Sequence, residues 1–279
     1  MVHEAVTSDR YGVMGYPVAH SRSPVIHRLF AQQTDQDMQY ELLQVSPGML
    51  ETAIRQFQHT GGKGLNITVP HKQEAVKLVD QLSERARTAS AVNTLSFRSG
   101  EICGDNTDGI GLLRDLVVNL DIKIEGANIL ILGAGGATRG IVGPLLEMLP
   151  GSLRIANRAL AKADALVKRF GDMGPVSACR FDEVPTTVPY DLVINATSAG
   201  LHGETPPYPA AAITETTSCY DLSYSLKPTP FSVWAREAGA QQSIIGWGML
   251  VEQAAESFHI WRGVRPDTTP VLKELSVTA

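Results

Sequence analysis

The first side chains that could do chemistry stand in residues 65–75, LNITVPHKQEA. Asn66 and Thr68 fall on one side of a predicted strand, and Lys72 follows in the first turn of a predicted helix. Strands of a parallel sheet are usually covered on both faces, so two polar residues at a strand's carboxyl end indicate a ligand. A lysine there also opposes the positive end of the helix dipole, and we interpret it as functional rather than merely solvated.

A carboxylate in GDNTDGIG is a suitable partner for this lysine. Asp108 stands just inside another predicted helix start, where capping by Asp108 or by Asp105 is the alternative role. An ammonium and a carboxylate close to one reacting oxygen can share proton transfer, because the carboxylate keeps the ammonium oriented. We therefore predict Lys72 and Asp108 as a catalytic pair.

Two serines in HSRSP form a further polar site. Ser21 and Ser23 stand at the mouth of a helix whose first residue is predicted to be Pro24. Ser23 suits the N-cap position of that helix. Two hydroxyls at a positive helix end also suit a carboxylate ligand, and one residue can serve as both cap and ligand contact.

A glycine-rich turn in ILILGAGGATRG indicates a dinucleotide site. A buried strand turns through Gly133, Gly135 and Gly136 into a helix, which lets backbone N–H groups approach a pyrophosphate. A tight turn that binds nothing is the alternative, because Thr138 occupies the third glycine position of the strict G-x-G-x-x-G pattern.

The next predicted strand, RIANR, distinguishes the two nicotinamide dinucleotides. A site for NAD would place an acidic residue here to hold the ribose diol. Asn157 and Arg158 stand there instead, with Lys162 four residues on. A guanidinium can engage a phosphate with two hydrogen bonds, so the sequence favours NADP over NAD.

Two α/β units in series must position these residues. The first hundred residues alternate strands and helices, with a long helix predicted over 70–87 and a hairpin over 91–105 that turns at Ser99-Gly100. The pattern restarts near residue 107 with a helix over 109–120, and a last amphipathic helix is predicted over 248–264. Strands are predicted at residues 10–18, 39–45, 64–69, 127–136, 152–158, 191–197 and 218–224, and further helices at 23–33, 48–61 and 137–149.

Composition excludes several classes of function. The chain has 279 residues, 43% of them hydrophobic, and a net charge of −5, so no excess of basic residues exists to bind nucleic acid. Seven histidines without an H-x-x-x-H pair and three scattered cysteines predict neither a metal site nor a disulfide framework. We expect a cytoplasmic protein with a small-molecule substrate, without a signal peptide or membrane span, and a homodimer is possible.

The motifs together resemble the shikimate dehydrogenase family across nearly the whole chain. Their co-occurrence in one order is highly specific: HSRSP, GLNITVPHK, AVNTL, GDNTDGIG, GAGGATRG, NR, INATSAG, YDLSY and GMLVEQA. The resemblance implies reversible NADPH-dependent reduction of 3-dehydroshikimate to shikimate, in aromatic amino-acid biosynthesis. It implies two α/β domains, with residues 1–107 and 248–279 binding substrate and residues 108–247 forming a Rossmann-type NADP domain, and an active site in the cleft between them.

The resemblance also assigns roles residue by residue. Lys72 and Asp108 are the implied catalytic pair, and Ser21 and Ser23 hold the substrate carboxylate. The implied contacts to substrate hydroxyls are Asn66, Thr68, Asn93, Tyr224 and Gln253. The implied cofactor contacts are Gly133, Ala134, Gly135, Gly136, Ala137, Asn157, Arg158, Lys162, Thr197, Ser198, Gly246 and Met249.

Two positions depart from the family pattern. Ala159 stands where the family usually has threonine, which removes a hydroxyl from the phosphate site, and Ile245 replaces an aspartate often found before Gly246. A quinate/shikimate dehydrogenase that uses NAD is one alternative function. A catalytically silent NADP-binding sensor is another, which the intact Lys72 and Asp108 disfavour.

Overall fold

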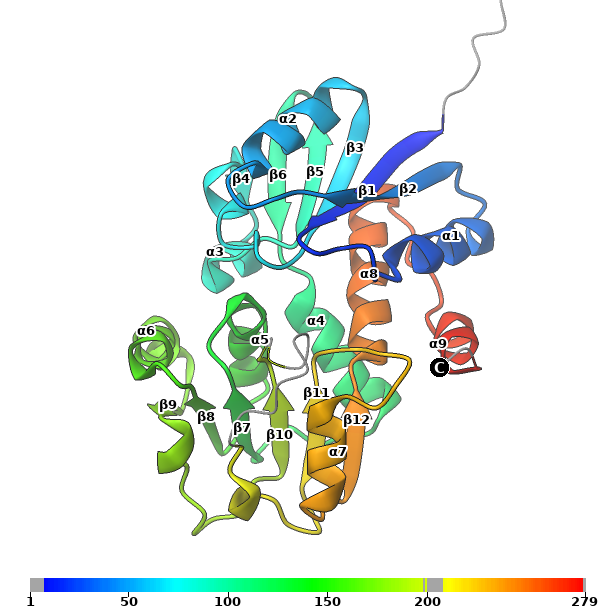
Figure 1. The fold of residues 1–279 in the computed structure, drawn as a ribbon. Helices are drawn as coiled ribbons and strands as arrows, with labels where there is room; N and C mark the ends of the chain where they lie inside the picture. The colour runs from blue at the N-terminus through cyan, green and yellow to red at the C-terminus, as the bar shows by residue number, and fades with distance from the viewer. Residues whose placement is uncertain (1–7, 198, 200–207, 278–279) are drawn as a thin grey trace, which may run out of the picture. The chain divides into compact units, whose positions relative to one another are not determined.

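The computed structural model describes residues 8–197, 199 and 208–277, and the chain divides into two compact units (Figure 1). The first unit comprises the described part of Met1–Thr107 together with Gln253–Val271. The second comprises Asp108–Glu252 and the described part of Leu272–Ala279. The chain therefore leaves the first unit next to the expected boundary and returns to it at Gln253, inside a helix, rather than at residue 248.

The first unit is built on a mixed six-stranded sheet in the order β2-β1-β3-β5-β6-β4 (Figure 1). Its first three strands run parallel, β5 and β6 form an antiparallel hairpin, and β4 pairs with β6 in parallel. The strands are β1(Asp9–Gly15), β2(Met38–Gln44), β3(Gly62–Ile67), β4(Gln81–Leu82), β5(Thr94–Arg98) and β6(Glu101–Asp105). The helices of this part of the chain are α1(Ser23–Gln33), α2(Leu50–His59), η1(Ala75–Lys77) and α3(Glu84–Ala89).

Helices cover both faces of this sheet. Helix α2 buries Leu50, Ile54 and Phe57 in one apolar cluster with Leu65 and Ile67 of β3. The opposite face, which carries the alternate residues of β3, packs against α1 and α8(Trp247–Arg262). The period-2 alternation of β3 thus separates an apolar face from a face with polar and small residues.

The predicted hairpin is confirmed at its turn. Ser99 and Gly100 both have positive φ, 52° and 86°, as a two-residue turn between antiparallel strands requires. Glycine adopts this backbone without steric cost, and a Cβ at Gly100 would meet no atom within 4 Å.

The predicted helix over residues 70–87 is wrong. Residues 70–74 form turns, followed by η1, the short strand β4 and α3. Asp80 accepts the Ile102 backbone N–H at 2.7 Å, and Ser83 caps α3 by accepting the Ala86 N–H, so contacts with β6 and a local cap interrupt the helical pattern. Lys72 therefore lies in a turn, and the argument from a helix dipole at this position does not hold.

The start of α1 also differs from the prediction. The helix begins at Ser23, and Arg22 is the N-cap residue without a side-chain capping bond. Ser23 is thus the first helical residue rather than the cap.

The second unit is a fully parallel doubly wound sheet in the order β12-β11-β10-β7-β8-β9 (Figure 1). Counted from β7, this is the strand order 3-2-1-4-5-6 of a Rossmann fold, which confirms the expected class. The strands are β7(Asn128–Leu132), β8(Ser152–Ala156), β9(Val176–Cys179), β10(Leu192–Asn195), β11(Ser218–Asp221) and β12(Gln242–Ile245).

Helical segments alternate with these strands. They are α4(Asp108–Leu113), the π-helical segment η2(Arg114–Asn119), α5(Gly136–Glu147), α6(Leu160–Phe170), η3(Gly171–Met173), η4(Phe181–Glu183), η6(Ala210–Ala212), α7(Pro230–Glu237) and, at the end of the chain, α9(Thr269–Val277). The sequence patterns do not predict α6, α7, α9, β9 or β12. Among the described residues, no helix is long and apolar enough to cross a membrane.

The close contact of Gly64 with α8 generates a stability prediction. A Cβ at Gly64 would lie 2.4 Å from Trp261 Nε1 and 2.7 Å from the Leu95 carbonyl oxygen. Gly64→Ala should lower the free energy of unfolding by about 1–3 kcal/mol, because overpacking displaces both neighbours. Urea unfolding measures this change.

The matched control is Gly171→Ala, where φ is −59° and no atom lies within 4 Å of the added methyl group. It should be neutral or slightly stabilising. Equal losses for the two variants would contradict the proposed packing of Trp261 on β3.

Candidate functional site

The polar residues of the first unit gather at the sheet edge, which here means the end of the sheet formed by the carboxyl ends of β1 and β3 and the start of β5. Met14 pairs with Ile67 in parallel register, and Asn66 pairs with Thr94 in antiparallel register. The carboxyl ends of β1 and β3 therefore meet the start of β5 at the same edge. The side chains that follow β3 and precede β5 come together there, as a ligand site at the end of a sheet requires.

The turn that carries Lys72 is pinned on both sides. The buried His71 ring makes a 2.7 Å hydrogen bond through Nε2 with the Val45 carbonyl, and the Lys72 carbonyl accepts the Val92 N–H at 2.8 Å. These bonds fix the backbone around Lys72, whose side chain is half-buried. The peptide bond between Val69 and Pro70, just before this turn, is cis.

Asn66 is the centre of a buried hydrogen-bond network. Its amide Nδ2 donates to the Asn93 carbonyl at 3.2 Å, to Thr94 Oγ1 at 3.2 Å and to Ser257 Oγ at 3.0 Å. Its Oδ1 accepts from the Tyr40 hydroxyl at 2.7 Å, and the residue is 7% exposed. The structure therefore places Asn66 under the edge of the sheet, with its polar atoms already engaged by the protein.

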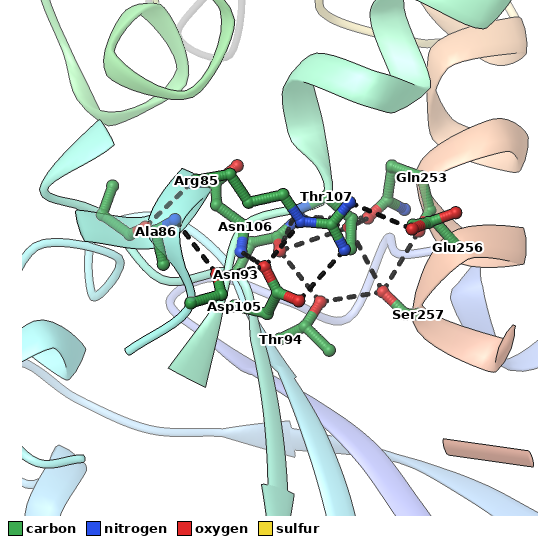
Figure 2. A network of polar contacts seen from close by, with 12 residues as sticks. Arg85, Ala86, Asn93, Thr94, Asp105, Asn106, Thr107, Gln253, Glu256 and Ser257 are labelled. Carbon is green, nitrogen blue, oxygen red and sulfur yellow. Dashed lines mark hydrogen bonds and ion pairs between the residues drawn. The ribbon is translucent and has the colours of Figure 1, made fainter. Parts of the chain in front are cut away.

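Asn93 extends this network toward α8, as Figure 2 shows. Its Oδ1 accepts the Thr107 backbone N–H at 2.8 Å, and its Nδ2 donates to Thr107 Oγ1 at 2.9 Å and to Gln253 Oε1 at 3.4 Å. Two of the predicted substrate contacts, Asn93 and Gln253, thus touch each other. Thr68 is half-buried one residue beyond β3, next to Gly15.

A network of ion pairs links the end of β6 to α3 and α8. Arg85 donates to both oxygens of Asp105, at 2.7 and 3.0 Å, and to Glu256 at 3.0 Å (Figure 2). Arg265 donates to the second oxygen of Glu256 at 2.7 Å. Burial alone would raise the pKa of Asp105, but hydrogen bonds from Arg85 and Ser83 outweigh burial, and the pKa is lowered.

Ser21 and Ser23 contact each other directly. The Ser21 hydroxyl donates to Ser23 Oγ at 3.1 Å and accepts the Ser23 backbone N–H at 3.3 Å. Both hydroxyls stand at the N-terminus of α1, where backbone N–H groups lack helical partners. This pair could hold an anion, as the sequence predicts.

His27, one turn further along α1, is buried and unused by the predicted chemistry. Its ring stacks on Tyr40 at a centroid distance of 4.2 Å and an interplanar angle of 8°. Neither ring nitrogen has a hydrogen-bond partner among the residues that the structure describes. Burial lowers the pKa of His27 to about 3, so the ring is uncharged near neutral pH. It stacks on the tyrosine whose hydroxyl donates to Asn66.

In the second unit, the glycine turn lies at the switch point between β7 and β10. Gly133 has φ 107°, and a Cβ there would lie 3.0 Å from the Ala196 carbonyl and 3.1 Å from the Thr197 nitrogen. Both the positive φ at position 133 and the short distances to residues 196 and 197 therefore require glycine there. Ala134 is buried beside it, and α5 begins at Gly136, followed by Ala137.

Unlike Gly133, Gly135 has open space beside it that suits a bound phosphate group. Its φ is −93°, and a Cβ there would meet nothing within 4 Å, so neither strain nor packing requires glycine. The open space lies at the N-cap of α5, where backbone N–H groups point outward. Thr138 replaces the third glycine and closes the turn with a 2.9 Å hydrogen bond from its hydroxyl to the Gly133 carbonyl.

The residues that are predicted to bind the 2′-phosphate of NADP follow β8. Asn157 donates its side-chain N–H to the Ala159 carbonyl at 2.8 Å, while Arg158 and Lys162 are exposed. Ala159 is the N-cap residue of α6 and makes no side-chain capping bond. Two exposed cations thus stand within three residues of the α6 N-cap, and this set of groups suits a phosphate dianion.

Thr197 follows β10 and is hydrogen-bonded to Asn195, the last residue of that strand. Its N–H and hydroxyl both reach Asn195 Oδ1, at 3.1 and 2.7 Å, and Asn195 Nδ2 donates to Asp221 at 2.9 Å. Ser198 lies outside the described residues, so its predicted role stays a prediction.

Tyr224, Gly246 and Met249 lie after β11 and β12. The Tyr224 ring packs against Trp247 at a centroid distance of 5.1 Å. A Cβ at Gly246 would lie 2.9 Å from the Asp221 carbonyl oxygen, and Met249 is buried at the start of α8.

Asp108 is buried as the first residue of α4, in the second unit, whereas Lys72 belongs to the first. A Cβ at Gly109 would lie 2.5 Å from the Gly140 carbonyl oxygen and 2.3 Å from Pro144. Helix α4 therefore packs closely on α5, the helix that begins in the glycine turn. Asp108 is thus held at the N-terminus of α4, next to the contact of Gly109 with the middle of α5.

Sequence reasoning missed several residues that build the site: Tyr40, His27, Thr94, Thr107, Arg85 and Ser257. Thr94 stands in AVNTL and Thr107 in GDNTDGIG, but those motifs drew attention to their neighbours Asn93 and Asp108. The other four stand in none of the quoted motifs, because a Tyr on a strand or a Ser on a helix has the same sequence signal whether it faces solvent or a buried amide. Among the described residues, no group of His, Cys, Asp and Glu could hold a metal ion.

Family models match three segments of the chain. They are the shikimate dehydrogenase substrate binding domain over residues 13–95, shikimate / quinate 5-dehydrogenase over residues 116–203 and the shikimate 5′-dehydrogenase C-terminal domain over residues 246–275. A protein of Alkalilimnicola ehrlichii named shikimate dehydrogenase (NADP(+)) is 53% identical over 268 residues, covering 96% of this chain and 98% of that protein. A protein of the same name from Methylococcus capsulatus is 54% identical over 268 residues, covering 96% of each.

Solved structures agree with this similarity. The Ael1 enzyme of Pseudomonas putida has a TM-score of 0.88 and 46% identity, covering 96% of this chain and 98% of that chain. Shikimate 5-dehydrogenase of Thermus thermophilus, solved in complex with NADP(H) and shikimate, has a TM-score of 0.84 and 30% identity, covering 97% and 100%.

The buried His27 ring generates a pH prediction. Its folded-state pKa of about 3 lies below the ordinary value of 6.5, so the unfolded chain binds a proton that the folded protein does not. The stability that depends on neutral His27 is complete above pH 6.5 and is lost as pH falls toward 3. The slope approaches about 1.4 kcal/mol per pH unit once the unfolded histidine is protonated.

His27→Phe keeps the ring contact with Tyr40 and removes this slope, so the difference from wild type should change between pH 7 and pH 5. Urea unfolding at several pH values measures it. His59→Phe, at the exposed end of α2, is the matched control and should leave the slope intact. Identical pH dependence of wild type and His27→Phe would contradict the neutral buried ring.

The uncapped start of α6 generates a second prediction. Ala159→Thr supplies a hydroxyl in the extended conformation of an N-cap (φ −99°, ψ 98°) and should raise the free energy of unfolding by about 0.5–1 kcal/mol. Ala161→Thr, two residues into the helix, is the control and should be slightly destabilising because threonine has lower helix propensity. A loss of stability in Ala159→Thr would show that the position does not act as a cap.

Proposed function

The chain belongs to the shikimate dehydrogenase family, and from this premise we propose that it reduces 3-dehydroshikimate to shikimate with NADPH, reversibly. The observation that carries the proposal is the pinned turn of Lys72, in the same unit as a polar network that fixes Asn93 and Gln253. A ring ketone that bears hydroxyls and a carboxylate needs such a set of donors and acceptors around one proton-transfer group.

The second unit supports NADP as the cofactor. The open face at Gly135 suits the pyrophosphate, and exposed Arg158 and Lys162 beside the uncapped α6 suit the 2′-phosphate. NADPH supplies the hydride when bound. A site for NAD would need a carboxylate in place of Asn157 or Arg158, so an NAD-dependent quinate/shikimate dehydrogenase is not favoured.

Lys72 and Asp108 are the proposed catalytic residues. The Lys72 ammonium stabilises negative charge that develops on the ketone oxygen and supplies the proton that forms the hydroxyl. Asp108 orients that ammonium and receives charge compensation from it. In the reverse direction the neutral Lys72 amine, oriented by Asp108, accepts the hydroxyl proton.

The proposed substrate contacts are the ones that the family resemblance implies. Ser21 and Ser23 would hold the carboxylate, and Thr68, Asn93, Tyr224 and Gln253 the hydroxyls. Asn66 is part of the same proposed set, but its amide is already bonded to four protein groups. We expect its main effect to be the orientation of its neighbours. We also propose a cytoplasmic location and a homodimer.

The decisive experiment is an assay of the pure protein for shikimate-dependent reduction of NADP, with NAD and quinate as parallel arms. Turnover with shikimate and NADP should greatly exceed turnover with the other pairs. Absence of any shikimate-dependent reduction would favour a catalytically silent NADP-binding protein.

Lys72→Ala should lower kcat roughly 10²–10⁴-fold, because the group that stabilises the alkoxide and transfers the proton is lost. The KM for shikimate should change little. Lys77→Ala, five residues along and exposed in η1, is the control and should retain activity. Near-normal turnover of Lys72→Ala would remove Lys72 from the catalytic role.

A further inference from the structure

We propose that Asp115 and Tyr220 form a buried clamp that holds residues 246–249 in place for hydride transfer, which makes them positioning residues for the reaction. The inference rests on the proposed function, because it takes Gly246 and Met249 as cofactor contacts near the nicotinamide, as the family resemblance implies. None of the sequence motifs assigns a role to Asp115 or Tyr220.

The clamp is a continuous chain of hydrogen bonds. The Met249 backbone N–H donates to the Tyr220 hydroxyl oxygen at 3.2 Å, and that hydroxyl donates to Asp115 Oδ2 at 2.5 Å. Tyr220 is fully buried and Asp115 is 4% exposed. A hydroxyl that accepts one bond and donates another is restricted to one orientation, so the chain fixes the Met249 backbone relative to η2.

Asp115 is also in close steric contact with residues 246–249. A Cβ at Gly248 would lie 1.8 Å from Asp115 Oδ1, so the Asp115 carboxylate occupies the place of a side chain at position 248. On the preceding residues, a Cβ at Gly246 would lie 2.8 Å from the Leu222 carbonyl oxygen. The two glycines let the backbone approach β11 and η2 on either side of Trp247.

A buried carboxylate is costly, and its surroundings indicate a specific reason to keep it. Asn119 Nδ2 donates to Asp115 Oδ1 at 3.0 Å and to Glu252 Oε1 at 3.3 Å, and Arg114 pairs with Glu252 at 3.1 Å. Burial raises the pKa of Asp115 above its ordinary value, while the hydrogen bonds from Tyr220 and Asn119 act in the opposite direction. Asp115 thus accepts hydrogen bonds from Tyr220 and Asn119 that an apolar residue at this position could not accept.

The clamp also connects two parts of the proposed site. Helix α4 begins at the proposed catalytic Asp108 and continues without a break into η2, which carries Asp115. Helical turns with π geometry are frequent at functional sites. At the other end of the clamp, Trp247 packs against Tyr224, a proposed substrate contact. A shift of residues 246–249 would therefore move a proposed cofactor contact and a proposed substrate contact together.

The test is Tyr220→Phe, which removes the hydroxyl and leaves the Met249 N–H and Asp115 without their shared partner. We expect kcat to fall at least about tenfold, because small displacements of reacting groups are costly to rate. The deuterium isotope effect with 4-deuterated NADPH should rise, since hydride transfer becomes more rate-limiting. The dissociation constant of adenosine 2′,5′-bisphosphate, which probes only the Arg158 end of the cofactor site, should stay within about twofold of wild type.

Two further variants separate positioning from stability. Tyr190→Phe, at a buried tyrosine of the same unit outside residues 246–249, should lose stability without losing kcat. Asp115→Asn keeps an acceptor oxygen for Tyr220 and should retain more activity than Asp115→Ala. Equal kcat in Tyr220→Phe and Tyr190→Phe, or a parallel loss of bisphosphate binding in Tyr220→Phe, would overturn the clamp. Inactive wild-type protein would instead refute the proposed function, so the two failures are distinguishable.

Discussion

The candidate site of the first unit depends on the rule that buried polar groups must be hydrogen-bonded. Asn66 and Asn93 are buried amides at the edge of a sheet, and each can be satisfied in only one orientation. Asn93 in turn fixes the Thr107 backbone, immediately before the proposed catalytic Asp108. Because an unsatisfied amide in this network would cost more than any single bond contributes, the network sets the geometry of the edge.

The second unit reaches comparable rigidity by a different route. Its key contacts are between backbones, at positions where glycine allows an approach that no other residue tolerates. Gly133 lies against residues 196–197 at the switch point of the sheet, and Gly109 allows α4 to pack on α5. Gly135 is free of both constraints, and its open face is the part of the turn that suits a ligand.

Charged groups that are buried or partly buried connect the proposed chemistry to the scaffold in both units. Arg85 holds Asp105 and Glu256 behind the sheet edge of the first unit, and Asp115 holds residues 246–249 in the second. Each group accepts or donates bonds that an apolar residue could not. Arg85, Glu256 and Asp115 act through other groups and stand in none of the quoted motifs.

The sequence by itself determined the class of each unit, the glycine turn, the basic residues after β8 and the hairpin at Ser99-Gly100, because each depends on local residue types and spacing. It also indicated Lys72 and Asp108, but for Lys72 through a helix that does not form. Only the tertiary structure decided that residues 70–87 break into turns, a strand and a short helix, since pairing with β6 outweighs local helical preference. It likewise decided which polar side chains meet, such as Tyr40 with Asn66 and Tyr220 with Asp115, because hydrogen bonds between residues 26 and 105 positions apart have no local signal.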